Sequence, residues 1–142
     1  MQKYTIFWIE QEFCYHYFYK SEILFRFLNE YMNNNSRNDL QSQFDFITKS
    51  IPYSNLVTHI QRFHGNQIEL KVNGRKIDLI KNNNKVTLYL KERSMIIKCT
   101  SVQEADFLLF GALKMFDPSF FIVENGSTNS GWITPVKKEA LL

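Results

Sequence analysis

The spacing of apolar residues changes along the chain, from mainly helical in the first half to strand-like in the second. Residues 3–9 form one β-branched and aromatic run, which predicts a buried strand. Residues 11–63 predict a helical region. From 67 to 100 apolar and polar residues alternate, which predicts an antiparallel meander. Residues 101–116 return to the helical period, so the pattern predicts one more helix there.

Local signals divide the helical region into several helices. Helix formers without Pro or Gly predict a helix over 12–34, which could restart at Ser21. Another helical stretch covers 37–50 and ends before a proline, because the residue preceding proline is disfavoured in the α conformation. A short helix over 55–63 follows, with Ser54 as its expected cap.

The second half carries clear turn and cap signals. Asn73-Gly74 is the strongest hairpin signal and should join the first two strands of the meander. A capping box of Ser101 and Glu104 should open the helix over 101–116. The expected strands of this half are 67–72, 75–81, 85–91, 95–100, 119–124 and 131–136.

These elements predict an α+β fold with a largely antiparallel sheet of about five to six strands and a single domain over 1–142. The last strand contains Pro135, which cannot donate to a ladder, so it should lie at an edge. Aromatic residues make up 15% of the chain, which excludes a disordered tail. That content exceeds the usual need of a core, so part of it could face a partner.

The residues that usually carry catalysis are sparse and scattered. Cys14 and Cys99 are expected to be packing residues of a reduced protein, and the three histidines lack the spacing of a metal site. No phosphate loop or nucleophile elbow occurs. We therefore expect no enzyme, no cofactor and no metal. Without a signal peptide or an apolar run of membrane-spanning length, the expected location is the cytoplasm.

The net charge of +3 comes from 17 basic and 14 acidic residues and favours an ordinary solvated surface. The main alternative is a small nucleic-acid-binding protein that uses a basic sheet face. Its candidate residues lie on or near the hairpins: Lys71, Arg75, Lys76, Lys81, Lys85, Lys91 and Lys98.

The first half of the 12–34 helix has aromatic residues on all sides. Residues 23–33 instead have polar residues on the side opposite their apolar stripe. Phe13 and Tyr17 differ by about 40° in helical phase. One interpretation buries this turn between the sheet and the third helix, and the other exposes the pair as an interface anchor. On the third helix, Phe46 lies about 120° away from the apolar stripe and beside Gln43.

Three segments occur in a distinctive order and spacing. The first is Glu12-Phe13-Cys14-Tyr15-His16-Tyr17-Phe18, the second is Phe46-Ile47-Thr48 leading to Ile51-Pro52, and the third is Gly131-Trp132-Ile133-Thr134-Pro135-Val136-Lys137. In these segments the chain resembles the SirA family, the sporulation inhibitors of replication of Bacillus-type bacteria. The resemblance covers both ends and is weak over 53–95. It departs from the family at Cys14, where the family has a small residue, and at Tyr19, where it has Gly.

The resemblance implies that the chain binds the N-terminal domain of the replication initiator DnaA and blocks its assembly at the origin. Phe13 and Tyr17 would be the main anchors, with Gln43 adding a polar contact. The exposed position expected for Phe46 adds it to this partner-binding set. Trp132 and Pro135 would be structural, because Pro135 matches a family position whose substitution impairs function through folding. The expected protein is a monomer before binding and makes no direct contact with nucleic acid.

Overall fold

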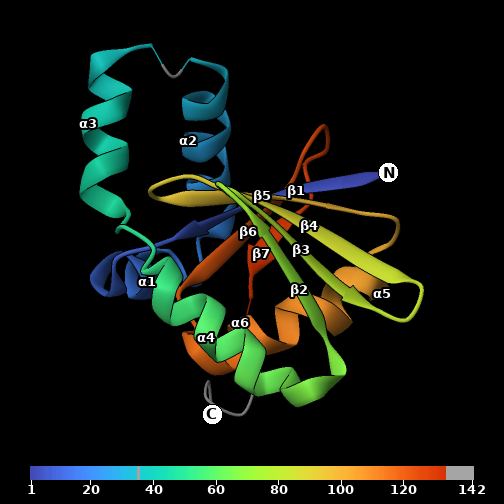
Figure 1. Cartoon of the computed structure of the whole chain (residues 1–142). Helices are drawn as coiled ribbons and strands as arrows, with labels where there is room; N and C mark the ends of the chain where they lie inside the picture. Colours follow the sequence, from blue (N-terminus) through green and yellow to red (C-terminus); the bar gives the residue numbers. More distant parts are fainter. Residues whose placement is uncertain (35, 134–142) are drawn as a thin grey trace, which may run out of the picture.

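The computed structural model describes residues 1–34 and 36–133, and within them seven strands form a single antiparallel sheet (Figure 1). The strand order is β2-β3-β4-β5-β1-β6-β7. The strands are β1 (Gln2–Trp8), β2 (Glu69–Asn73), β3 (Lys76–Lys81), β4 (Asn84–Leu90), β5 (Ser94–Cys99), β6 (Phe120–Glu124) and β7 (Ser130–Trp132). The α+β class and the meander are confirmed, while the expected count of five to six strands is slightly low.

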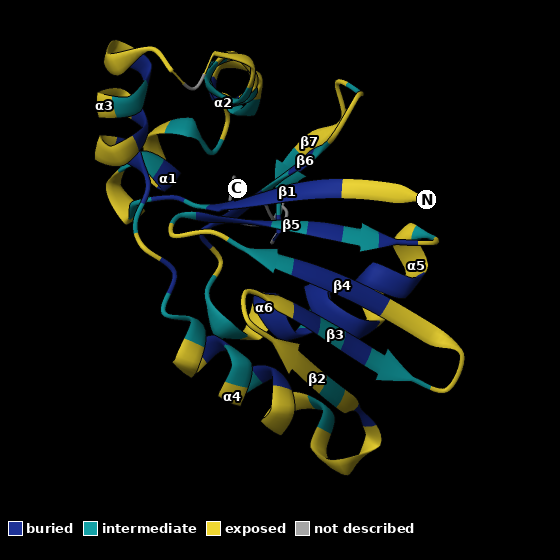
Figure 2. Ribbon diagram, turned by 45° about the horizontal axis from the view of Figure 1, so that its top comes forward, coloured by how far each residue is buried: buried dark blue, intermediate teal, exposed yellow. Residues whose placement is uncertain are grey.

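Helices cover the sheet unequally on its two faces. The helices are α1 (Gln11–Tyr17), α2 (Ser21–Asn33), α3 (Asn38–Ile47), α4 (Tyr53–His64), α5 (Val102–Ala105) and α6 (Gly111–Phe116). In Figure 1, α4, α5 and α6 lie beneath the sheet, whereas α2 and α3 stand above one end of it. Figure 2 shows β1 and β5 mostly buried and the edge strand β2 mostly exposed.

Two hydrophobic cores result, one on each face of β1. The first core lies between the sheet and α4–α6, and the second lies between the sheet and α2–α3. Ile6 points into the first core and Phe7 into the second, because successive strand residues face opposite sides. The continuous apolar run that predicted a buried strand is explained by this double burial.

The helical region follows its local signals with two exceptions. The stretch expected over 37–50 ends at Ile47, where Thr48 is already extended, so Pro52 is not what ends it. The helix over 12–34 does restart at Ser21 and is divided into α1 and α2. The expected cap at Ser54 is wrong, because α4 begins at Tyr53 with Pro52 before it. Proline suits this position because it has no N–H to leave unpaired at a helix start. Ser54 lies inside the first turn, where its carbonyl accepts a hydrogen bond from the Thr58 hydroxyl at 2.9 Å.

The Asn73-Gly74 signal does mark a hairpin, but its turn is shifted by one residue. Asn73 pairs with Lys76, so the two central residues of the turn are Gly74 and Arg75. Gly74 has φ +62, as a type II′ turn requires at its first central residue. The glycine therefore sets the turn type, and Asn73 stays in the ladder.

The helix over 101–116 is interrupted by a π-helical segment, η2 (Asp106–Phe110). Two histidines of α4 bind the carbonyls of this region. His59 Nε2 donates to the Ala112 carbonyl at 2.8 Å, and His64 Nε2 donates to the Leu108 carbonyl at 2.9 Å. Both side chains are thus engaged in holding α4 against η2 and α6.

The expected capping box is half formed. The Glu104 amide donates to Ser101 Oγ at 3.2 Å, but the Glu104 carboxylate accepts from the amides of Thr100 at 2.8 Å and Lys85 at 3.1 Å. Burial raises the pKa of Glu104, but these hydrogen bonds and one from the Thr100 hydroxyl outweigh it and hold the pKa below its ordinary value. The carboxylate therefore ties α5 to β4 and β5.

We expect Glu104→Gln to lower the free energy of unfolding by about 1–2 kcal/mol at neutral pH, because charge-assisted hydrogen bonds are replaced by neutral ones. A lowered folded-state pKa contributes stability above the unfolded-state pKa and loses it as pH falls through the folded value. The free energies of unfolding of the wild type and Glu104→Gln should thus become equal at acid pH, below about pH 4. Urea unfolding at several pH values checks this, with the exposed Glu69→Gln as control; a constant difference down to acid would contradict it.

Trp132 ends β7 and covers the second core. Its ring lies 5.0 Å from Phe121 and 5.9 Å from Phe18, both edge to face. The structural role expected for Trp132 thus has a packing basis, and β7 lies at the sheet edge as expected. Pro135 lies outside the described residues.

Candidate functional site

Helices α1 and α3 are joined at one corner of the molecule by backbone hydrogen bonds. The Glu10 amide donates to the Ile47 carbonyl at 2.8 Å, and the Lys49 amide donates to the Trp8 carbonyl at 2.9 Å. An isolated bridge between Ile9 and Thr48 lies between them. The start of α1 is therefore fixed against the end of α3, although the two helices are separated in sequence by α2.

This junction brings two of the expected partner-binding residues into contact. The rings of Phe13 on α1 and Phe46 on α3 meet edge to face with centroids 5.3 Å apart. Phe46 is 64% exposed, whereas Phe13 is half-buried and rests on the second core. An exposed ring supported from below by a second ring is held in place without being covered. That arrangement suits a binding anchor, because little conformational entropy remains to be lost.

The other two expected residues lie close by along the same helices. Tyr17 is half-buried one turn after Phe13, packs on the second core and meets the His16 ring at 4.7 Å. Gln43 is exposed on α3, one turn before Phe46. In its burial, α1 lies between the two interpretations, because Phe13 and Tyr17 are neither fully exposed nor enclosed.

The most exposed aromatics of this corner are not among the expected partner-binding residues. Tyr15 is 69% exposed and Tyr19 is 66% exposed. Tyr19 stacks on Phe18 with centroids 5.7 Å apart, which extends the aromatic surface across the link between α1 and α2. The helical phase of Tyr15, opposite to Phe13, was the signal that could have identified it.

A hollow of about 380 Å³ lies beside Phe46, between the ends of α1 and α3. It is lined by charged side chains of both signs: Glu10, Glu12, Asp45, Lys49 and Arg93. An aromatic centre with a charged rim is the usual anatomy of a protein interface. We define the α1–α3 surface as Phe13, Tyr17, Gln43 and Phe46.

Arg93, in the turn between β4 and β5, fixes the end of α3. Its guanidinium donates to the carbonyls of Thr48 at 2.6 Å and Asp45 at 3.3 Å, and it pairs with the Asp45 carboxylate at 3.7 Å. The last carbonyls of a helix have no partner within the helix, and a cation there also suits the helix dipole. Arg93 therefore acts as a positioning residue for the turn that carries Phe46.

We expect Arg93→Ala to lower the free energy of unfolding by about 1–2 kcal/mol, since it leaves helix-end carbonyls without their charged donor. Because the end of α3 loosens, partner binding by the α1–α3 surface should weaken. The loss of binding should be larger than the loss of folded protein at the same temperature can explain. Hydrogen exchange of the Ile47 and Thr48 amides measures the loosening directly. Arg93→Lys should recover part of both effects, and unchanged exchange in Arg93→Ala would refute the positioning role.

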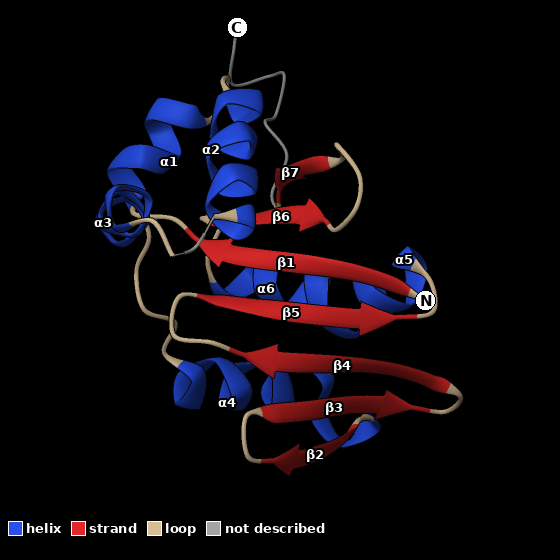
Figure 3. Ribbon diagram, turned by 90° about the horizontal axis from the view of Figure 1, so that it is seen from above, coloured by secondary structure: helices blue, strands red, loops and turns tan. Residues whose placement is uncertain are grey.

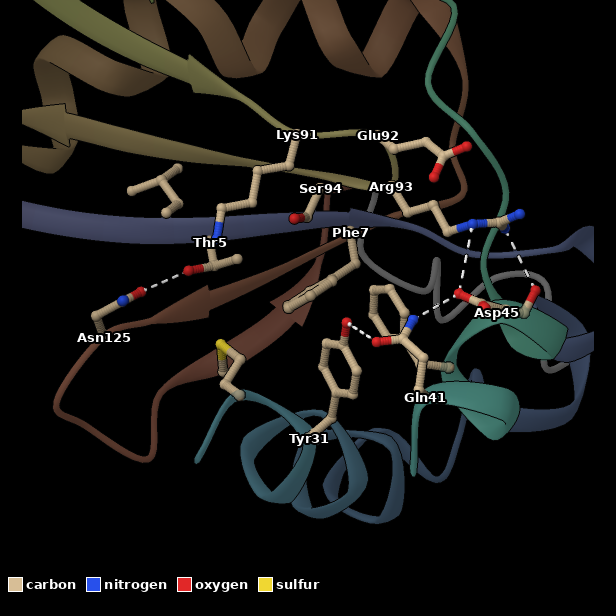
Figure 4. Close-up of a pocket in the computed structure, with 13 residues that line it drawn as sticks. Thr5, Phe7, Tyr31, Gln41, Asp45, Lys91, Glu92, Arg93, Ser94 and Asn125 are labelled. Atoms are coloured by element: carbon tan, nitrogen blue, oxygen red, sulfur yellow. Dashed lines mark hydrogen bonds and ion pairs between the residues drawn. The ribbon is translucent and has the colours of Figure 1, made fainter. Parts of the chain in front are cut away.

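A second cavity, of about 320 Å³, lies between the sheet and the α2–α3 pair (Figure 4). The polar side chains that line this cavity near α3 form hydrogen bonds with one another. The Tyr31 hydroxyl donates to Gln41 Oε1 at 3.1 Å, and Gln41 Nε2 donates to Asp45 Oδ1 at 2.8 Å. Tyr31 also stacks on Phe44 with centroids 3.9 Å apart. These contacts hold α2 and α3 together, so we assign the cavity wall a structural role.

The structure also places Cys14 and shows whether side chains are arranged to hold a metal ion. Cys14 is buried beneath α1, and burial raises the pKa of its thiol, which keeps it a packing residue. Among residues 1–34 and 36–133, no three His, Cys, Asp or Glu side chains are placed to hold a metal ion. No helix in the same part of the chain is long and apolar enough to cross a membrane.

Comparisons with known proteins show what the chain is similar to. A family model described as "Sporulation inhibitor of replication protein SirA" matches residues 2–137. The chain is also 25% identical over 150 aligned positions to the "Sporulation inhibitor of replication protein SirA" of Bacillus subtilis (strain 168), with 95% of each chain covered. The match runs through the region 53–95, where the motif resemblance was weak.

Proposed function

The chain belongs to the SirA family of sporulation inhibitors of replication, and we propose that it binds the N-terminal domain of the initiator DnaA through the α1–α3 surface. The observation that supports this most is the exposed Phe46 ring held against Phe13. Aromatic side chains near the centre of an interface supply much of its binding energy. The regulatory family favours inhibition by occupancy rather than by chemistry.

In this proposal the inhibitor covers a surface that DnaA molecules need for assembly at the origin. Phe46 and Phe13 enter an apolar recess of the DnaA domain, Tyr17 contributes its ring and hydroxyl, and Gln43 adds a hydrogen bond. Binding of this kind is stoichiometric, so inhibition tracks the fraction of DnaA that is bound. A 1:1 complex is expected, with the α1–α3 surface buried in it.

Calorimetric titration with the purified DnaA N-terminal domain of the same organism tests the proposal. We expect saturable 1:1 binding, and no binding to DnaA that lacks this domain. Competition between the two DnaA forms for labelled inhibitor provides a second measurement. Absence of binding to the isolated N-terminal domain, with binding retained by the truncated DnaA, would assign the partner surface elsewhere.

A further inference from the structure

Within residues 1–34 and 36–133, no helix covers a large part of the sheet face on which α2 and α3 stand. Viewed from above, β2 to β5 and the first part of β1 lie in front, with α4, α5 and α6 behind them (Figure 3). Helices α1–α3 cover only the end formed by β1, β6 and β7. We call the uncovered part the open face.

Strand pairing brings lysines together on the open face. Directly paired residues share a face, so one row runs across five strands. The row is Lys3, Lys98, Thr87, Asp78 and Lys71. Neighbouring rows add Lys76, beside Tyr89, and Lys85, beside Ile80. Lys81 instead faces α4–α6, where its Nζ lies 4.7 Å above the Phe107 ring.

The described strands of the open face carry a formal charge of +3, which equals the formal net charge of the full sequence. Its described strands hold five lysines against two carboxylates, Asp78 and Glu69. The remaining basic residues number 12 (17 less five) and the remaining acidic residues also number 12 (14 less two). Surface lysines often serve only to keep a sheet face or edge hydrated. Five lysines gathered against two carboxylates on one described face are a stronger feature than that.

The arrangement of the lysines on this face also lowers the stability of the free protein. Lys3 and Lys98 are directly paired on neighbouring strands, and like charges in that position are destabilising. Lys98 Nζ lies 5.0 Å above the Tyr89 ring. Asp78 is already engaged, accepting from the Thr87 hydroxyl at 2.7 Å and lying 3.9 Å from Lys85 Nζ. An anionic ligand over the row would relieve the repulsion between Lys3 and Lys98.

We propose that the open face binds the phosphate backbone of DNA, separately from the partner bound by the α1–α3 surface. Protein interfaces are depleted in lysine and have an apolar centre, whereas phosphate contacts come from lysines on a polar surface. The open face matches the second description. Tyr89 adds a ring on which an unpaired base can stack. The inhibitor would thus hold onto DNA near the initiator that it blocks.

Fluorescence anisotropy with a labelled duplex and a labelled single strand, each about 20 nucleotides long, tests the proposal. If five lysines contact phosphates, affinity should fall roughly 500-fold between about 50 and 200 mM salt, a slope near −4.5. The variant Lys71→Ala/Lys76→Ala/Lys98→Ala should reduce that slope to about −1.8. Comparing the duplex with the single strand shows whether Tyr89 stacking contributes.

A triple variant of equal charge change serves as control: Arg26→Ala/Arg62→Ala/Lys114→Ala, all exposed on helices. It should keep the wild-type slope, and both triple variants should keep wild-type affinity for the DnaA N-terminal domain. Absence of binding at about 50 mM salt, or equal losses in the two variants, would overturn the proposal. Stronger competition by polyglutamate than by unlabelled DNA would also overturn it and assign the face to an acidic protein segment.

Discussion

Phe46→Ala should weaken binding to the DnaA N-terminal domain by at least about 30-fold, the equivalent of about 2 kcal/mol. The side chain is largely exposed in the free protein and would be buried in the complex, so its truncation removes energy from binding alone. The free energy of unfolding should change by less than about 0.5 kcal/mol, as for surface substitutions in general. Calorimetric titration and urea unfolding of the same preparation measure both quantities.

The control for Phe46 is Met115→Ala on α6, where a large side chain is 72% exposed on the other side of the sheet. Its binding should match the wild type. Phe13 requires a different design, because it also packs on the second core. Phe13→Leu keeps much of the packed volume and removes the aromatic edge, so it should lose affinity with little loss of stability. If Phe46→Ala binds as tightly as Met115→Ala, the α1–α3 surface is not the interface.

Much of the fold could be predicted from the sequence because its signals are local. The change of period at residue 67, the glycine of the first hairpin and the proline before α4 each act within a few residues. The π-helical segment η2 could not be predicted in this way. His64 of α4 donates to the Leu108 carbonyl within it, and His59 donates to the Ala112 carbonyl of α6 just beyond it. Partners this distant in sequence leave no periodic pattern.

The residues of the proposed site could be selected from the sequence, but their contacts could not. Helical phase marked the first half of the 12–34 helix and Phe46 as unusual, and the family resemblance then selected Phe13 and Tyr17. It could not show that Phe13 supports Phe46, because that contact depends on hydrogen bonds between β1, α1 and the end of α3. The open face could not be predicted from the sequence for a related reason. Alternation along one strand is visible in a sequence, but the row formed by Lys3, Lys98 and Lys71 depends on register across five strands.

The two cores share β1, so damage to the second core should destabilise the whole molecule. Trp132→Ala removes the ring that packs on Phe121 and Phe18. Truncating a packed aromatic costs about 3–5 kcal/mol, and the lower end applies because Trp132 is only half-buried. We expect a loss of about 3 kcal/mol, a large fraction of the stability of an ordinary domain.

Urea unfolding of Trp132→Ala can be followed at the opposite core, because Trp8 remains and packs on Phe120 with centroids 5.7 Å apart. Trp8 fluorescence and far-ultraviolet circular dichroism should give one coincident transition, since Ile6 and Phe7 of the same strand belong to different cores. Trp132→Phe keeps a ring in place and should recover more than half of the lost stability. A Trp8 transition unchanged from the wild type, with an earlier loss of helical signal, would show instead that α1–α3 unfold as a separate unit. In that case binding to the DnaA domain would fail while the sheet, and DNA binding by its open face, remained intact.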